Sequence, residues 1–324
     1  MSRQNKKIYC LGGANIDCKF TAMNAIHPGT SNPVVSHSSF GGVARNVAEN
    51  LSRWTQDVHL QTAVGGDPAG QVLLSAAREC GIHVERSLIL EYANTAHYYA
   101  VMDQDGNLQV AYADMGIYDQ IPTDLFMKNC EPWPEKSLLF LETNLPSNLI
   151  SALIQAGQAH QCLICIDPVS VHKAGKLPPH LENVFLIKPN QAEMARLSGM
   201  DIACLRDCRQ AGYRLLDRGV ENIVISLGAS GYVFMNKNQC RHVSPPRIAE
   251  IKDVNGAGDA FCAGIIYGLQ QNYSIMQACE IGAAAAALTI QSYQTVAHDI
   301  SASCLQTSID RHYLNREYSH AAIF

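Results

Sequence analysis

The sequence of 324 residues lacks features that would place it in several common classes of protein. No run approaches the roughly 20 apolar residues that a membrane span needs, and the start MSRQNKKIYCLGG has no signal-peptide core. We therefore expect a cytoplasmic protein that does not enter a membrane. Basic charge is not in excess either, because the net charge is -5. The chain has no footprint for a nucleic acid polymer, so we expect small-molecule partners.

Metal-site spacing is also missing. Of the 12 cysteines, Cys162 and Cys165 form an isolated CxxC pair, and Cys204 and Cys208 lie four residues apart. Neither pair is accompanied by a second CxxC or a histidine pair. Most cysteines stand in apolar runs such as HQCLICID, which is typical of buried positions, so we expect free thiols. Internal repeats and low-complexity segments are absent, and 47% hydrophobic with 16% charged residues indicates an ordinary globular chain.

Short apolar runs alternate with stretches of helical periodicity along most of the chain. The pattern predicts strands at 7–13, 58–65, 137–143, 162–168, 183–189 and 222–228. Helical stripes between them include 43–54, 72–77 and 149–156. Strands that alternate with helices indicate an α/β fold with a mostly parallel central sheet covered by helices on both faces, which makes three layers.

Two segments break this alternation, at about 17–40 and 95–117. The second has period-two alternation around DQDGN, whose Asp-Gly pair favours a β-hairpin. We interpret the two segments as a small β-sheet lid that excludes water from a cleft during group transfer. An edge hairpin without a role is the alternative. The tail after Ser301 is expected to be a terminal helix or frayed.

The run GAGD is the clearest chemical signal. Gly256, Ala257 and Gly258 precede Asp259, and the following residues can continue as a helix. Small residues at a helix start leave backbone N–H groups open to an anion. Asp259 would stand beside that anion, where a general base could accept the proton of an attacking hydroxyl. The alternative is a helix N-terminus whose acid stabilises its own dipole.

The stretch DVNGAGDAFCAGI resembles the C-terminal signature of the ribokinase-like, or PfkB, family of carbohydrate and nucleoside kinases. GGANID, FGGVARNVA, KPNQAE and ISLGASGY are similar to further family landmarks in the same order, so the resemblance spans about 7–288. A Walker A loop is absent, since AGKL lacks its earlier glycine and its final Ser or Thr. The resemblance implies one ribokinase-like domain over 1–324. It also implies ATP- and Mg²⁺-dependent transfer of a phosphoryl group to an alcohol.

The resemblance also implies where the ligands lie. Asp259 would be the catalytic base, with Gly256, Ala257 and Gly258 as the anion hole. The acceptor would be held by Asn15, Asp17, Gly41, Gly42, Arg45, Asn46 and Lys173. Glu142 is a further candidate ligand of the acceptor or of water, because it stands at the end of a predicted strand, where open α/β sheets bind ligands. The nucleotide would contact Asn190, Ser226, Gly228, Gly231 and Asn255. Glu193, with Asn190, would hold hydrated Mg²⁺ through water.

Some of these positions have other readings. From the residues alone, Asp17 could form an Asx turn, PNQAE an ordinary helix start, and Arg45 could lie on a solvated helix face. The family often binds a monovalent cation such as K⁺, which would lie near Asp253 and Asn255. Lids of this kind often pair between subunits, which would give a homodimer.

Within the family, GGVARN, AVGGDPAGQ, DQDGNLQVAYADM and DPVSVHK look most like the pseudouridine kinase subfamily. This implies that the acceptor is the 5′-hydroxyl of pseudouridine. Residues that discriminate the base would lie on the lid, where the candidates are Thr95, His97, Tyr99 and Asp114. The alternatives are a kinase for uridine, inosine, adenosine, ribose or fructose, and a non-catalytic regulator that binds a nucleoside or sugar.

Overall fold

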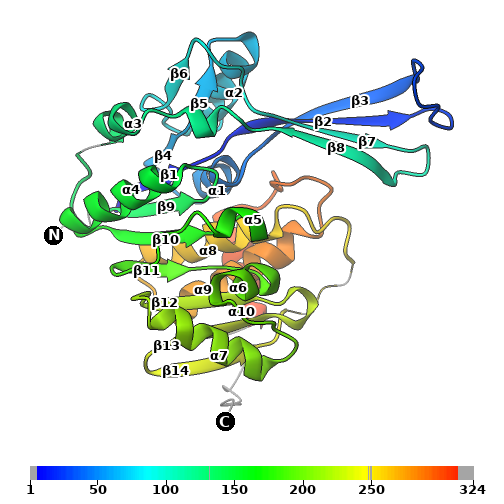
Figure 1. The fold of residues 1–324 in the computed structure, drawn as a ribbon. Helices are drawn as coiled ribbons and strands as arrows, with labels where there is room; N and C mark the ends of the chain where they lie inside the picture. The colour runs from blue at the N-terminus through cyan, green and yellow to red at the C-terminus, as the bar shows by residue number, and fades with distance from the viewer. Residues whose placement is uncertain (1–5, 131, 247, 249, 313–324) are drawn as a thin grey trace.

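The computed structural model describes residues 6–130, 132–246, 248 and 250–312, and its largest unit is an eight-stranded sheet (Figure 1). The strands are β1 (Ile8–Leu11), β4 (Val58–Gln61), β9 (Leu138–Glu142), β10 (Leu163–Asp167), β11 (Val184–Ile187), β12 (Asn222–Ser226), β13 (Tyr232–Asn236) and β14 (Gln239–Val243). Their spatial order is β14-β13-β12-β11-β10-β9-β1-β4. Neighbours from β4 to β12 pair in parallel, whereas β13 and β14 are antiparallel additions.

Helices cover both faces of this sheet. One apolar cluster contains residues of α1 (Val43–Ser52), α2 (Pro68–Glu79), α8 (Ala257–Gln270), α9 (Ile275–Thr289) and α10 (Ala302–His312). The other contains residues of α3 (Thr123–Cys130), α4 (Ser147–Ala159), α6 (Gln191–Ser198) and α7 (Leu205–Leu216), and the short α5 (Val171–Ala174) packs on α6. Along β1, Ile8 and Cys10 enter the first cluster, while Tyr9 and Leu11 enter the second. The predicted three-layer α/β/α fold is confirmed.

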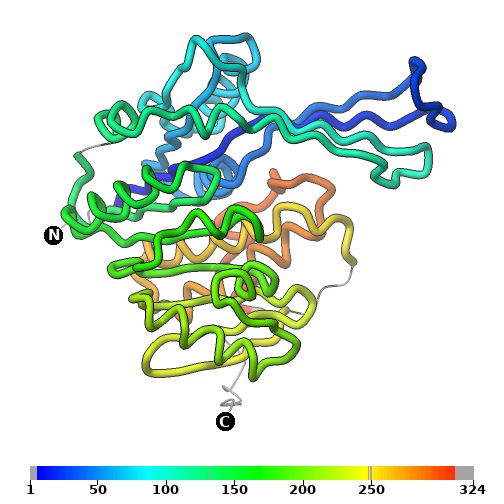
Figure 2. Tube along the Cα trace, viewed as in Figure 1, coloured from blue at the N-terminus to red at the C-terminus, as the bar shows by residue number. Residues whose placement is uncertain are grey.

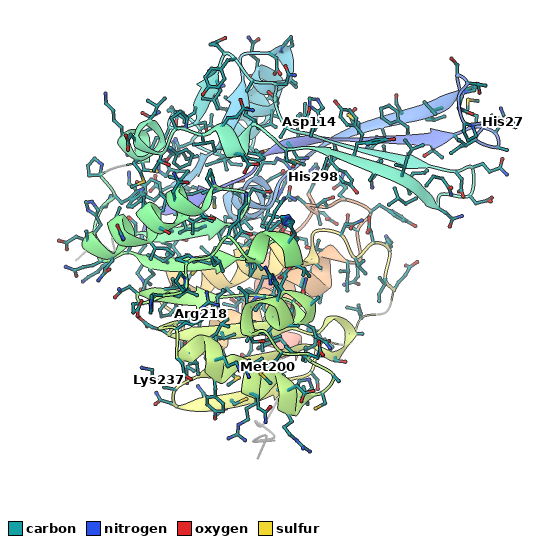
Figure 3. The ribbon with its side chains drawn as sticks, viewed as in Figure 1. His27, Asp114, Met200, Arg218, Lys237 and His298 are labelled. Atoms are coloured by element: carbon teal, nitrogen blue, oxygen red, sulfur yellow. The ribbon has the colours of Figure 1, made fainter. Side chains whose placement is uncertain are left out.

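A separate four-stranded sheet projects from this body. Its strands are β2 (Asn15–Ala22), β3 (Val34–Gly41), β7 (His97–Met102) and β8 (Leu108–Asp114), in the order β3-β2-β7-β8. We call it the outlying sheet. The β7–β8 pair is antiparallel, so the predicted hairpin is confirmed, and β2 pairs with β7 in parallel. Figure 2 shows the two hairpins side by side, and Figure 3 places His27 at the far tip and Asp114 near the root.

The structure differs from the sequence expectations in the strand at 58–65 and in two strands that follow Ser226, while the tail forms one of the two expected structures. The predicted strand at 58–65 is divided at Thr62, so that β4 joins the main sheet and β5 (Ala63–Gly65) pairs with β6 (Leu88–Leu90). Strands β13 and β14, which follow the short 3-10 turn Gly228–Ser230, were not predicted. The tail forms α10 as far as residue 312, and the rest of the prediction lies outside the described residues.

Two further expectations concerned membrane-spanning segments and the state of the cysteines. None of the helices in the described ranges combines the length and the apolar character needed to cross a membrane. All 12 cysteines are free thiols in the structure, and Cys162, Cys165 and Cys208 are buried. Cys165 belongs to the first apolar cluster, and Cys162 and Cys208 belong to the second. All three therefore act as small core residues.

Candidate active site

Charged and polar side chains gather at one edge of the main sheet. Glu142, Asp167 and Ser226 are the last residues of β9, β10 and β12, and Lys188 directly follows β11. The carboxyl ends of parallel strands meet at the same edge, where open α/β sheets bind ligands. Helix α8 begins beside this edge, because Lys188 and Asp167 contact residues of its first turns.

The start of α8 is open to an approaching group. Gly256 is the N-cap residue with a left-handed backbone (φ 77°), and a Cβ atom there would collide with the carbonyl of Thr295. At Gly258 a Cβ would meet only the Lys188 ammonium, 3.8 Å away. Backbone N–H groups, a helix dipole and a lysine therefore face the same space, which suits a phosphate group.

Substitutions at the two glycines should separate folding from binding. Gly256→Ala should lower the melting temperature, because alanine is strained at positive φ and its Cβ meets Thr295; the cost is of order 1–3 kcal/mol. Gly258→Ala should leave the melting temperature close to that of the wild type but raise the KM for ATP, because its methyl group enters the anion space. Thermal denaturation and ATP kinetics on both variants check this, and a folded Gly258→Ala enzyme with normal kinetics would contradict it.

Asp259 stands in the first turn of α8 and is partly buried. Asn46 Nδ2 of α1 donates to Asp259 Oδ2 at 2.8 Å, and the Asn46 amide oxygen accepts from Arg45 at 3.1 Å, which fixes the amide orientation. Burial raises the pKa of Asp259 to about 7, against the opposing effect of the Asn46 hydrogen bond. A carboxylate with that pKa can both accept and release a proton near neutral pH.

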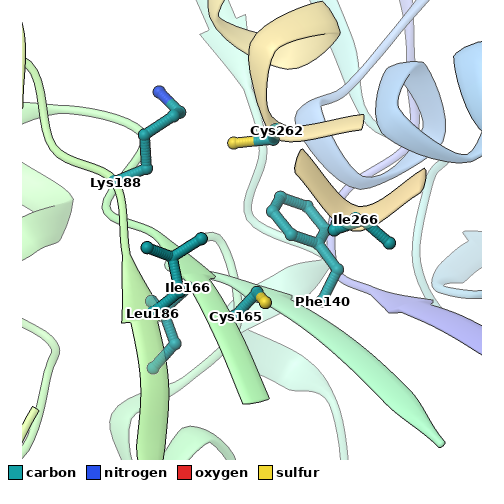
Figure 4. A pocket seen from close by; sticks show the side chains of 7 residues that line it. All are labelled: Phe140, Cys165, Ile166, Leu186, Lys188, Cys262 and Ile266. Atoms are coloured by element: carbon teal, nitrogen blue, oxygen red, sulfur yellow. The ribbon is translucent and has the colours of Figure 1, made fainter. Parts of the chain in front are cut away.

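Lys188 and Asp167 form a buried ion pair behind Gly258. Their charged atoms are 3.0 Å apart, with side chains 5% and 8% exposed. Burial alone would lower the pKa of Lys188, but the Asp167 carboxylate outweighs it and raises that pKa above its usual range. The Cys262 thiol donates to the same carboxylate at 3.4 Å, and Figure 4 shows Lys188 and Cys262 above an apolar pocket lined by Phe140, Cys165, Ile166, Leu186 and Ile266.

This pair was not among the residues singled out from the sequence. A usable signal was present in the sequence, because each charged residue ends or directly follows an apolar run that is predicted to be a strand. Glu142 was chosen on that reasoning, and the same reasoning would have found Asp167 and Lys188.

The residues predicted to hold an acceptor meet where β2, β3 and α1 join. Asn15 donates to Asp17 at 2.7 Å, and a Cβ at Gly41 would collide with the Asp17 carboxylate. Gly42, the N-cap of α1, has φ 99°, and a Cβ there would meet the carbonyl of Gly13. Burial raises the pKa of Asp17. The structure therefore groups these residues, and their contact with an acceptor stays a prediction.

Arg45 of α1 is buried, and its partners lie on α1 and β3. It is 6% exposed, pairs with Glu49, and donates to the Phe40 carbonyl at 2.9 Å. The solvated-face alternative is therefore wrong, because burial and these partners hold the guanidinium inside. Arg45 also donates to the Asn46 amide oxygen, and its contact with an acceptor stays a prediction.

The side-chain amide of Asn144 links Glu142 to Lys173, because it donates to the first and accepts from the second. The buried Glu142 carboxylate accepts hydrogen bonds from the Gly13 and Asn144 backbones, and Lys173 donates to the Asn144 side chain. Burial raises the pKa of Glu142 and lowers that of Lys173. The carboxylate thereby fixes the turn after β1, next to Asn15.

The predicted nucleotide residues occupy neighbouring turns. Asn190 and Glu193 form a capping box at the start of α6, and the Ser226 backbone N–H donates to the Pro189 carbonyl at 2.9 Å. Gly228 and Gly231 take positive φ angles of 57° and 86°. Asn255 donates through its backbone N–H to the Asp253 side chain at 2.9 Å.

The described residues contain no group of three or more His, Cys, Asp or Glu that could ligate a metal directly. The Glu193 oxygens each accept one hydrogen bond from Asn190 and keep further lone pairs, so they fit a hydrated cation held through water. Burial raises the pKa of Glu193, and the nearby Asp167 charge acts in the same direction.

The lid candidates do not gather around Asp17. Thr95 is fully buried, and its hydroxyl donates to Asp67 at 2.6 Å while accepting from Gly65. Strand pairing puts His97, Tyr99 and Asp114 on the face of the outlying sheet opposite to Asp17. If Asp17 holds the acceptor, these three side chains point away from it.

A helix start with open backbone N–H groups lies beside a hydrogen-bonded carboxylate at the carboxyl edge of a parallel sheet, an arrangement that suits an α/β phosphotransferase. Residues 5–301 match the model of the pfkB family carbohydrate kinases, and the chain belongs to that family. It is thus a carbohydrate or nucleoside kinase that uses ATP to phosphorylate an alcohol.

Comparisons with individual proteins agree with the family. The chain is 28% identical over 263 residues to pseudouridine kinase of Escherichia coli K12, covering 81% of this chain and 83% of that one. A carbohydrate kinase from Agrobacterium tumefaciens has a TM-score of 0.81 and 30% identity, covering 95% and 98%. Ribokinase of Arabidopsis thaliana, solved with ribose and ATP, has a TM-score of 0.81 at 18% identity, covering 94% and 99%, which shows a shared fold.

Proposed function

We propose that this kinase transfers the γ-phosphoryl group of ATP to the 5′-hydroxyl of pseudouridine. The observation that carries the proposal is the Asp259 carboxylate, bonded to Asn46 and raised in pKa to about 7 beside the Gly256–Gly258 backbone. The choice of acceptor is supported by the similarity to a pseudouridine kinase over most of the chain.

In the proposed reaction, Asp259 orients the acceptor hydroxyl and accepts its proton while the hydroxyl oxygen bonds to the γ-phosphorus. The bond from that phosphorus to the β–γ bridging oxygen breaks, and ADP leaves. The N–H groups at the start of α8 and the Lys188 charge stabilise the transferring group. Asp17 and Asn15 hold the ribose hydroxyls, since a carboxylate accepts two such donors.

The proposal includes a metal and a cation. Mg²⁺ neutralises charge on the ATP phosphates when bound, and Glu193 with Asn190 would hold its water shell. Ser226, Gly228 and Gly231 would lie against the nucleotide. A monovalent cation such as K⁺ would bind near Asp253 and Asn255, whose loop precedes α8.

We also propose a homodimer that pairs through the outlying sheet. Several apolar side chains on its strands are exposed, namely Val34, Val35, Leu108, Val110 and Tyr112. A sheet that exposes such residues is typical of an interaction surface. Sedimentation velocity on the wild type and on a Val35→Lys variant tests this; a monomeric wild type would contradict it.

The product decides the chemistry. After reaction with pseudouridine and Mg-ATP, phosphorus and proton NMR should locate the new phosphate on the 5′-carbon. The matched substrate 5′-deoxypseudouridine should give no product, because it lacks the attacking hydroxyl. Phosphate found on the 2′- or 3′-oxygen, or product from the deoxy substrate, would contradict the proposal.

A further inference from the structure

The outlying sheet has two faces, and the strand register decides which residues belong to each. Paired residues on neighbouring strands point to the same face, and successive residues alternate. Asp17 of β2 pairs with Ser39 of β3 and with Tyr98 of β7, and Tyr98 pairs with Ala113 of β8. Tyr98 therefore shares a face with Asp17, which we call the Asp17 face.

Contacts between side chains support this division. On the opposite face, Tyr99 stacks on Phe20, with centroids 6.5 Å apart, and on His97, with centroids 5.3 Å apart. The rings on that face therefore pack against each other. On the Asp17 face, a Cβ added at Gly41 would meet the Asp17 carboxylate, as expected for a residue diagonal to it.

Tyr98 is an aromatic residue of the outlying sheet that lies on the Asp17 face. It is half-buried, and among the residues that the structure describes its ring and hydroxyl have no stacking or hydrogen-bonding partner. A tyrosine combines a flat apolar face with a polar tip, so its ring can pack against a planar group while the hydroxyl stays in water. A planar group bound next to Asp17 would lie within reach of the Tyr98 ring.

We propose that Tyr98 determines specificity by packing its ring against the planar base of an acceptor nucleoside whose ribose is held by Asp17. This inference rests on the proposed function and adds the residue that separates nucleosides from free sugars. Side chains of paired strand residues are about 5 Å apart, and the base is joined directly to the ribose, so one ligand can reach both. A free pentose would reach Asp17 but offer no ring to Tyr98.

The test compares Tyr98→Ala, Tyr98→Phe and the control Tyr213→Ala by steady-state kinetics. Tyr213 lies on α7, outside the outlying sheet, and is 44% exposed, so it undergoes the same chemical change away from Asp17. Tyr98→Ala should raise the nucleoside KM about tenfold or more, as loss of base–aromatic stacking does, with little change for ribose. Tyr98→Phe should retain most of the nucleoside affinity, and Tyr213→Ala should resemble the wild type. The KM for ATP should be unchanged in all three, and thermal denaturation checks that each variant is folded.

The outcomes separate this inference from the proposed function. If the wild type prefers a nucleoside other than pseudouridine, the proposed acceptor is wrong, and the same variants test Tyr98 on that nucleoside. An unchanged nucleoside KM in folded Tyr98→Ala, or equal losses for nucleoside and ribose, would overturn the inference. A wild type that phosphorylates only free sugars would overturn both.

Discussion

Replacing Asp259 by Asn should lower kcat on the order of 10²-fold or more while the fold is retained. Asparagine keeps the size of the side chain and can still bond to Asn46, but it cannot accept a proton from the acceptor hydroxyl. Stopped assays of ADP release with saturating Mg-ATP and acceptor measure the loss. Asp299→Asn is the matched control, because it makes the same change at an exposed carboxylate outside the site. Near-normal turnover by Asp259→Asn would show that another group is the base.

The pH dependence gives an independent test of the same residue. Asp259 can act as a base only when ionised, and burial raises its pKa to about 7. The rate should therefore be low below pH 7 and rise as the pH increases through about 7, provided that no later step limits turnover. The residual activity of Asp259→Asn should lack this rise. A wild-type rate that is flat between pH 6 and 8 would contradict the raised pKa.

Replacing Lys188 by Met should destabilise the protein strongly. The variant leaves the buried Asp167 carboxylate without its ion-pair partner, which typically costs about 3–5 kcal/mol. The KM for ATP should rise as well, because a positive charge is lost 3.8 Å from the position of a Gly258 Cβ. Urea denaturation measures the first effect, and ATP kinetics at low temperature the second.

Two further variants control the Lys188 prediction. The double variant Lys188→Met/Asp167→Asn should recover part of the lost stability, since no unpaired charge remains buried. Lys176→Met removes an ion pair with Asp119 that is 26% and 72% exposed, and it should cost at most about 1 kcal/mol. If Lys188→Met lowers the free energy of unfolding no more than Lys176→Met does, the buried pair of Lys188 and Asp167 does not stabilise the fold.

Elements that depend on a short continuous segment could be predicted from the sequence. The run from Gly256 to Asp259 begins a helix as expected, because small residues, a left-handed cap and the apolar positions that follow lie within one continuous segment. The parallel strands were also predictable, since strands buried on both faces are continuous apolar runs. Strand β4 was extended too far because nothing in VHLQTAVG marks the change of sheet at Thr62.

Arrangements that depend on pairing between distant segments were not predictable. The contact of Lys188 with Asp167 requires that β10 and β11 be neighbours. The assignment of Tyr98, rather than Tyr99, to the Asp17 face depends on the β2–β7 register, and a shift of one residue would reverse it. The solvated alternative for Arg45 was wrong because Glu49 and the Phe40 carbonyl hold the guanidinium inside, and the sequence does not show that these groups are buried.

The central claim is tested most directly by ADP release with Mg-ATP across pseudouridine, uridine, cytidine, inosine, adenosine, ribose and fructose. The account predicts the highest kcat/KM for pseudouridine, with formation of one ADP for each pseudouridine 5′-phosphate. A higher kcat/KM for any other acceptor would contradict the assignment of pseudouridine, and nucleoside binding without ADP release would contradict catalysis itself.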